Sequence, residues 1–91
     1  MYECHVTVER PVNQETRELY ERVGTEHGWK TSMIDGDPVL GKKVFFYFTK
    51  HGSSFGSIKN RMFNLEEILG DRVVRSKIEH IVYDTKTKIG L

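Results

Sequence analysis

The pattern of apolar and polar residues divides the chain into segments with period two and segments with a period near 3.6. Residues 2–9 alternate strictly, which is typical of a strand with one buried face. Residues 29–34 indicate a second, weaker strand, and residues 44–48, with the sequence VFFYF, give the strongest strand signal. Residues 72–83 alternate again and predict a fourth strand. Its apolar positions Val74, Ile78 and Val82 lie opposite Arg75, Lys77 and Glu79.

Two segments have helical periodicity. In residues 14–27 one face carries Thr16, Leu19, Tyr20, Val23 and His27. Asn13 is suited to cap the start of this helix and Gly28 its end, whereas Gly24 inside it costs about 1 kcal/mol relative to alanine. The second helix follows the sequence HGSSFGS and ends before Gly70. Its apolar positions are Phe55, Ile58, Met62, Leu65 and Leu69.

The order of these elements predicts the fold class. Turn residues at 35–38 and 41–43 separate the second and third strands, and the other connections are also short. A β-α-β-β-α-β order predicts a ferredoxin-like α+β sandwich, in which two helices cover one face of an antiparallel four-stranded sheet. The first and third strands are then central neighbours, and the fourth lies beside the first. We expect a single domain over residues 1–91, with a frayed tail at 84–91.

Composition narrows the classes of function. The chain has 91 residues, with 14 Lys and Arg against 13 Asp and Glu, so its net charge of +1 does not favour a dedicated nucleic-acid binder. Its single cysteine, Cys4, cannot form an internal disulfide and indicates a reducing compartment. No signal peptide is recognised at residues 1–5, and the longest apolar run, residues 44–48, is too short for a bilayer span. We therefore expect a cytoplasmic protein without a membrane partner.

The face of the sheet opposite the helices is the candidate functional surface. If the apolar residues of each strand point toward the helices, the open face carries two histidines, two threonines, two aromatic residues and two cations. Histidine titrates nearest neutral pH, hydroxyl groups and cations suit phosphate oxygens, and aromatic rings stack on bases. The residues that we expect to bind a ligand are His5, Thr7, Tyr47, Thr49, His51 and Lys77.

The sequence His5-Val6-Thr7 resembles the H-x-T motif of the two-histidine phosphoesterases. The resemblance implies a metal-independent phosphodiesterase in which one histidine acts as base and the other as acid. The family has two such motifs, usually on two lobes of one chain. Here the second position falls to His51, in the sequence His51-Gly52-Ser53 or the reversed Thr49-Lys50-His51, neither of which matches the motif. If the chain is an enzyme, the acid–base pair is His5 and His51.

Two further motifs lie around the third strand. The sequence KKVFFYF, residues 42–48, resembles the third-strand motif of RNA-recognition domains, which implies that Phe45 and Tyr47 stack on bases beside Lys43. Bulky Val44 and Phe46 stand where that family has small residues. The loop 52–57 is one residue shorter than a P-loop and lacks its lysine. It is a helix N-terminus, capped by Ser53 or Ser54, whose N–H groups can also hold an anion beside Lys50 and Lys59.

Three functions remain open. The first is a small non-enzymatic binding or regulatory module that binds a phosphate-bearing molecule, a nucleotide or a partner protein on the open face. The second is the phosphodiesterase, and the third is a homodimer in which the open face is only an interface. The sequence points to no cofactor and no metal, because Asp35 and Asp37 are typical turn residues and Cys4 lies on the buried side of its strand.

Overall fold

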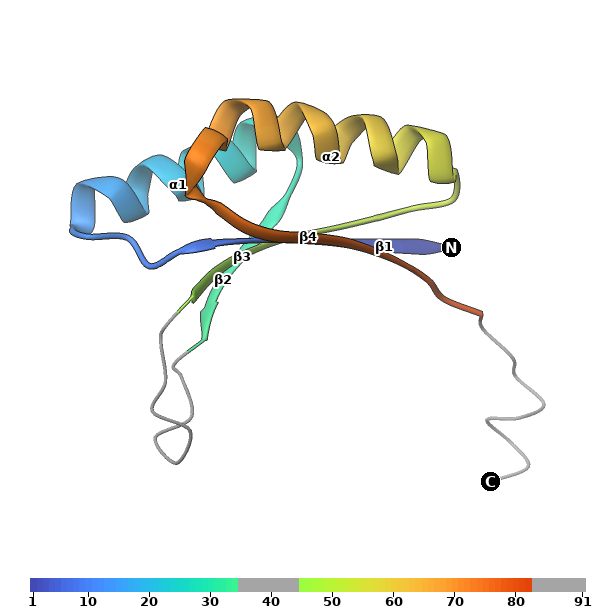
Figure 1. Cartoon of the computed structure of the whole chain (residues 1–91), viewed down its shortest axis with the longest axis horizontal. Helices are drawn as coiled ribbons and strands as arrows, with labels where there is room; N and C mark the ends of the chain where they lie inside the picture. Colours follow the sequence, from blue (N-terminus) through green and yellow to red (C-terminus); the bar gives the residue numbers. More distant parts are fainter. Residues whose placement is uncertain (35–44, 83–91) are drawn as a thin grey trace, which may run out of the picture.

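The structure, a computed structural model, describes residues 1–34 and 45–82. These residues form an α+β fold with one four-stranded antiparallel sheet and two helices (Figure 1). The elements are β1 (Tyr2–Glu9), α1 (Gln14–His27), β2 (Lys30–Ile34), β3 (Phe45–Gly52), α2 (Phe55–Leu69), a 3₁₀ turn (Gly70–Arg72) and β4 (Val73–His80). The turns expected at 35–38 and 41–43, residue Val44 and the tail 84–91 lie outside the described residues.

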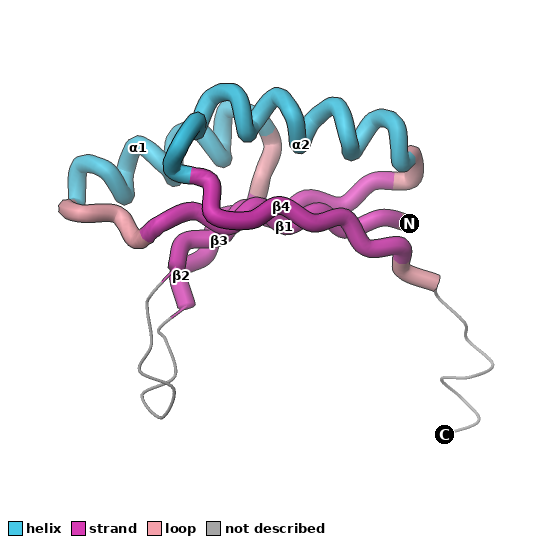
Figure 2. The backbone as a smooth tube through the Cα atoms, in the orientation of Figure 1, coloured by secondary structure: helices cyan, strands magenta, loops and turns pink. Residues whose placement is uncertain are grey.

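The strands are ordered β2-β3-β1-β4, so that β1 and β3 are central. This confirms the predicted positions of the first, third and fourth strands. Both helices lie on the same side of the sheet (Figure 2). No described element covers the opposite side, which we call the open face. Neither described helix is both long and apolar enough to cross a membrane.

The core lies between the sheet and the helices. As the alternation predicted, Cys4, Val6 and Val8 of β1 are fully buried. Phe46 and Phe48 of β3 lie beside them, and the ring of Tyr20 in α1 packs against both, at centroid distances of 5.2 and 6.1 Å. The core is completed by Trp29, Ile58, Leu65 and Leu69. Burial of each large apolar side chain contributes about 1.5–3 kcal/mol to folding.

The ends of both helices follow the capping residues seen in the sequence. The Asn13 side chain accepts a hydrogen bond from the Thr16 amide at 2.8 Å, and Ser54 accepts one from the Ser57 amide at 3.3 Å. Ser54, not Ser53, is therefore the N-cap of α2. Gly28 and Gly70 end the helices with φ angles of 74° and 60°, a backbone region that favours glycine.

The fourth strand differs from the prediction at its N-terminal end. Val74, expected on the helix side, is 51% exposed. The pairing of β4 with β1 shifts there: Thr7 pairs with Arg75, but the next residue, Val8, pairs with Val73. Val74 is the extra residue of a β-bulge. The bulge interrupts the alternation of side chains between the two faces of the strand, on which the prediction depended. The strand also ends at His80, so Val82 lies beyond it and is 75% exposed.

Strand β3 is longer than the apolar run that predicted it. It extends to Gly52 because Thr49–Gly52 pair with the first four residues of β1.

Two positions of the predicted apolar helix faces are less buried than expected, since Leu19 is 40% and Phe55 47% exposed. The Phe55 ring still contacts Tyr2, with 5.5 Å between the ring centroids.

Gly24 of helix α1 lies close to the start of strand β2. A Cβ atom at this position would lie 2.5 Å from Cγ2 of Thr31 and 3.2 Å from the carbonyl oxygen of Trp29. The Trp29 amide donates to the Gly24 carbonyl at 2.7 Å, which holds the two segments together. The glycine that was costly for the helix alone thus permits helix and strand to approach each other.

We expect Gly24→Ala to lower the free energy of unfolding by about 1–3 kcal/mol, because the added methyl group overpacks this contact. Gly56→Ala is the matched control: it is also helical, and a Cβ there has no neighbour within 4 Å. We expect this control to be neutral or to stabilise by up to about 1 kcal/mol. Urea denaturation followed by circular dichroism measures both. A Gly24→Ala protein as stable as the wild type would contradict the account.

Candidate functional site: a hollow on the open face

A hollow of about 310 Å³ lies on the open face of the sheet. All four strands contribute to it, and every lining residue carries a polar group. They are His5, Thr7, Ser32, Tyr47, Thr49, Arg75 and Lys77. A volume near 300 Å³ is at the small end of the range for small-molecule sites.

Strand register explains why these side chains meet. In one row across the sheet, His5 pairs with Lys77 on one side and with Thr49 on the other. In the adjacent row, Thr7 pairs with Arg75 and with Tyr47, and Tyr47 pairs in turn with Ser32. Residues directly opposite in neighbouring strands share a face. The hollow therefore lies over two neighbouring rows of paired residues. The cations stand at the β4 end of these rows, and the hydroxyl groups lie across the centre of the sheet.

Beside the hollow, one carboxylate joins the two histidines. Glu3 accepts from Nε2 of His5 through Oε1 at 2.5 Å and from Nε2 of His51 through Oε2 at 2.6 Å. On its other side, Nδ1 of His5 lies 3.1 Å from the hydroxyl oxygen of Thr49. These bonds form a continuous chain from His51 through Glu3 and His5 to Thr49, which lines the hollow.

The two histidines lower the pKa of Glu3. The hydrogen bond from His5 is the main cause, and the bond from His51 is the second. Glu3 is therefore ionised at neutral pH. A carboxylate can only accept hydrogen bonds, so both histidines must carry a proton on Nε2. The side chains of Glu3 and His5 are only 25% and 31% exposed, which limits competition from water.

The two cations of the hollow differ in their partners. Lys77 forms an ion pair with Glu79 on the same strand, at 2.7 Å. Among residues 1–34 and 45–82, Arg75 forms no ion pair. An arginine guanidinium presents five N–H donors in a planar arrangement that matches carboxylate or phosphate oxygens.

A second hollow, of about 240 Å³, lies at the N-terminus of α2. It is lined by Lys50, His51, Gly52, Ser53, Ser54, Ser57, Ile58 and Arg61. The Lys50 ammonium group donates to the Gly28 carbonyl oxygen at 2.8 Å and lies 5.8 Å from the Trp29 ring. Lys59 lies over the ring of Phe63 at 5.7 Å and does not line this hollow. Lys50 thus lies beside the N-terminus of α2, as expected, and it also binds the carbonyl oxygen at the end of α1.

The structure brings together five of the six residues expected to bind a ligand: His5, Thr7, Tyr47, Thr49 and Lys77. The sixth, His51, lies outside the lining and contacts it only through Glu3. Sequence reasoning placed Arg75 on the open face but did not select it, and it missed Ser32 entirely. The signal for Ser32 was weak because β2 does not alternate clearly, and only its pairing with Tyr47 places it in the site.

Cys4, His80 and His27, the other residues considered as candidates, lie away from both hollows. Cys4 is fully buried, and burial raises the pKa of its thiol to about 11. The imidazole of His80 stacks on Tyr2 with 4.8 Å between ring centroids. His27 lies in the last turn of α1. None of the three lines either hollow.

Comparison with known proteins adds no assignment. No protein-family model matches the sequence, and no curated protein matches it.

Within the described part of the chain, no group of three or more His, Cys, Asp or Glu side chains is placed to hold a metal ion. The side chains that line the hollow can supply hydrogen bonds, positive charge and proton transfer.

The lowered pKa of Glu3 predicts how stability depends on pH. The pKa of Glu3 is lower in the folded state than the ordinary value of 4.5 for a glutamate, so this carboxylate binds a proton more readily in the unfolded chain. The stabilisation is present above about pH 4.5 and is lost as pH falls through the folded pKa. We expect the stability advantage of the wild type over Glu3→Gln to shrink as the pH falls below about 4.5.

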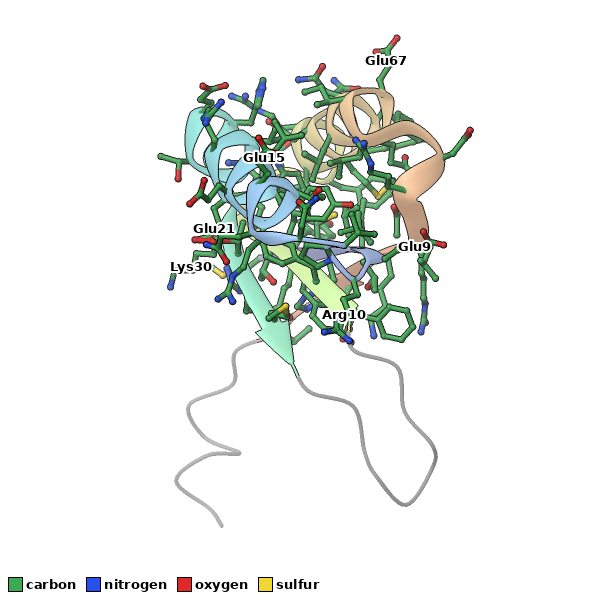
Figure 3. All side chains as sticks on the ribbon, turned by 90° about the vertical axis from the view of Figure 1, so that its left-hand side faces the viewer. Glu9, Arg10, Glu15, Glu21, Lys30 and Glu67 are labelled. Atoms are coloured by element: carbon green, nitrogen blue, oxygen red, sulfur yellow. The ribbon has the colours of Figure 1, made fainter. Side chains whose placement is uncertain are left out.

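Glu67→Gln is the matched control for loss of a carboxylate, because Glu67 points away from the sheet on the outer side of α2 (Figure 3). Chemical denaturation at several pH values measures all three proteins. A difference between wild type and Glu3→Gln that is constant with pH would show that the His5–Glu3–His51 bonds do not contribute in solution.

Proposed function

We propose that the protein is a small binding module whose hollow on the open face takes a phosphate-bearing small molecule such as a nucleotide. The single observation that carries this proposal is the position of Arg75. Arg75 lines a concave site together with Lys77, Thr7 and Thr49, and it has no ion-pair partner among the described residues. Such a set of donors suits phosphate oxygens.

Among the described residues, Tyr47 is the only Phe, Tyr or Trp that lines the hollow, which favours a nucleotide over an RNA strand. Tyr47 lines the site, but Phe45 does not, although both lie on β3. One ring can stack on one base, whereas binding a strand requires several stacked bases along a charged groove. A net charge of only +1 points the same way. We therefore propose a ligand with one base and one phosphate group.

The arrangement of the histidines supports binding more than hydrolysis. Both ring nitrogens of His5 are engaged, Nε2 by Glu3 and Nδ1 by Thr49. His51 does not line the hollow and directs its own Nε2 to the same carboxylate. A general acid or base needs a ring nitrogen within reach of the reacting oxygen. A phosphodiesterase that uses His5 and His51 thus stays the alternative, and turnover assays test it.

We also propose that the fold is of the ferredoxin-like class. The support is the central position of β1 and β3, the placement of β4 beside β1 and the helices on one side of the sheet. Many domains of this architecture have unrelated functions, so the class does not support the nucleotide proposal.

Arg75→Gln tests the proposal, because it removes the charge and the paired donors while keeping a similar side-chain length. We expect its affinity for AMP, measured by isothermal titration calorimetry, to fall roughly tenfold or more. Arg22→Gln is the matched control. Arg22 is an exposed arginine on α1, in the layer opposite the open face, and its loss should leave affinity unchanged.

The other interpretations give different results in the same experiment. Equal loss of affinity in Arg75→Gln and Arg22→Gln would indicate non-specific electrostatic attraction and would contradict a binding site at the hollow. Failure of AMP, cyclic AMP and inorganic phosphate to bind, together with a dimeric mass in solution, would favour an interface on the open face. Product in the calorimeter cell that disappears in His5→Ala would favour the phosphodiesterase.

A further inference from the structure

The hydrogen-bond chain from Glu3 to Thr49 ends at the wall of the hollow. Glu3 contacts His5 on one side, and His5 contacts Thr49 on the other. Thr49 is therefore the one lining hydroxyl group whose oxygen is bonded to an ionisable side chain, among the described residues. The direction of the bond between His5 and Thr49 depends on whether His5 is neutral or charged.

In neutral His5 the proton sits on Nε2, because Nε2 donates to the Glu3 carboxylate. Nδ1 then carries a lone pair, and the Thr49 hydroxyl must donate to it. This commits the only hydroxyl proton of Thr49, so only the lone pairs of its oxygen remain for the hollow. A phosphate oxygen, which is also an acceptor, finds no partner at this position.

In charged His5 the bond reverses. Nδ1 takes a proton from solvent and donates it to the Thr49 oxygen, so the Thr49 hydroxyl proton is free to point into the hollow. An anionic oxygen now meets a donor where it previously met an acceptor. It also lies near an additional positive charge, which strengthens the hydrogen bond.

We propose that His5 couples ligand binding in the hollow to the uptake of one proton, with Thr49 as the relay. This inference rests on the proposed function, because it requires that an anionic ligand occupies the hollow. It assigns different roles to two threonines of the same wall. Thr49 senses the charge of His5, whereas Thr7 has no such contact among the described residues and is a constant donor.

The groups that face His5 come from all four strands. On β1 it is bonded to Glu3, and on β3 it lies opposite Thr49, with His51 on the far side of the Glu3 carboxylate. On β4 it pairs with Lys77, next to Arg75 and Glu79, and on β2 Lys30 pairs with Thr49 in the same row. Among these groups Glu3 and Glu79 carry negative charge, whereas Lys77, Arg75 and Lys30 carry positive charge. A bound anion would add negative charge beside His5 and favour its charged form.

The test is calorimetric titration of the full chain with cyclic AMP and inorganic sulfate, whose charges stay constant between about pH 5 and pH 8, where histidine titrates. We expect the affinity for both probes to rise roughly tenfold as pH falls across this range. Repeating the titrations in buffers with different ionisation enthalpies should show uptake of up to one proton per ligand bound.

Matched variants separate the relay from a general effect of charge. Thr49→Val and Thr7→Val each remove one lining hydroxyl, but only Thr49→Val should flatten the dependence of affinity on pH. His5→Asn should also flatten it, whereas His51→Asn should retain it because His51 does not line the hollow. Circular dichroism of each variant verifies that it is folded.

Nitrogen NMR of the free protein tests the premise without any ligand, because neutral His5 should carry its proton on Nε2. Neutral His5 with its proton on Nδ1 would overturn the inference. Binding with the same affinity at every pH, or a pH dependence that is unchanged in either Thr49→Val or His5→Asn, would overturn it and leave the proposed function standing. No binding of either probe at any pH would overturn both.

Discussion

The register between β1 and β3 determines both faces of the sheet. The pairing of His5 with Thr49 and of Val6 with Phe48 directs polar side chains to the open face and apolar ones to the core. A slip by one residue would bury Glu3 and His5 and expose Val6 and Val8. Because burial of each large apolar side chain contributes about 1.5–3 kcal/mol, the core prevents this slip. The geometry of the site is thus maintained by residues that do not touch it.

The same register gives the open face its chemistry. It sets Thr49 beside His5 and places His51 opposite Glu3, so one carboxylate can accept from both histidines. It also sets Thr7 opposite Tyr47, and the pairing of β1 with β4 adds Arg75 to the same row. Beyond the row, the bulge at Val74 absorbs one residue, so that Val73 pairs with Val8 and packs against the core.

Much of this arrangement could be predicted from the sequence, because alternation in a strand reports directly which residues share a face. The alternation of apolar and polar positions alone placed His5, Thr7 and Tyr47 on the open face. It failed at Val74, since a bulge leaves no mark in the alternation, and at Ser32, since β2 alternates weakly. It could not reveal that Glu3 joins two histidines, because that depends on the register between strands about 50 residues apart. Nor could it show that Gly24 permits the approach of α1 to β2.

The central claim is that the hollow on the open face is a binding site for a phosphate-bearing molecule. The most direct measurement is an NMR titration of the isotope-labelled protein with AMP, cyclic AMP and inorganic phosphate. The account predicts that amide and side-chain shifts concentrate at Thr7, Tyr47, Thr49 and Arg75, with little change on α1. No shift with any of the three, combined with a rotational correlation time of a dimer, would contradict it and identify the open face as an interface between two copies.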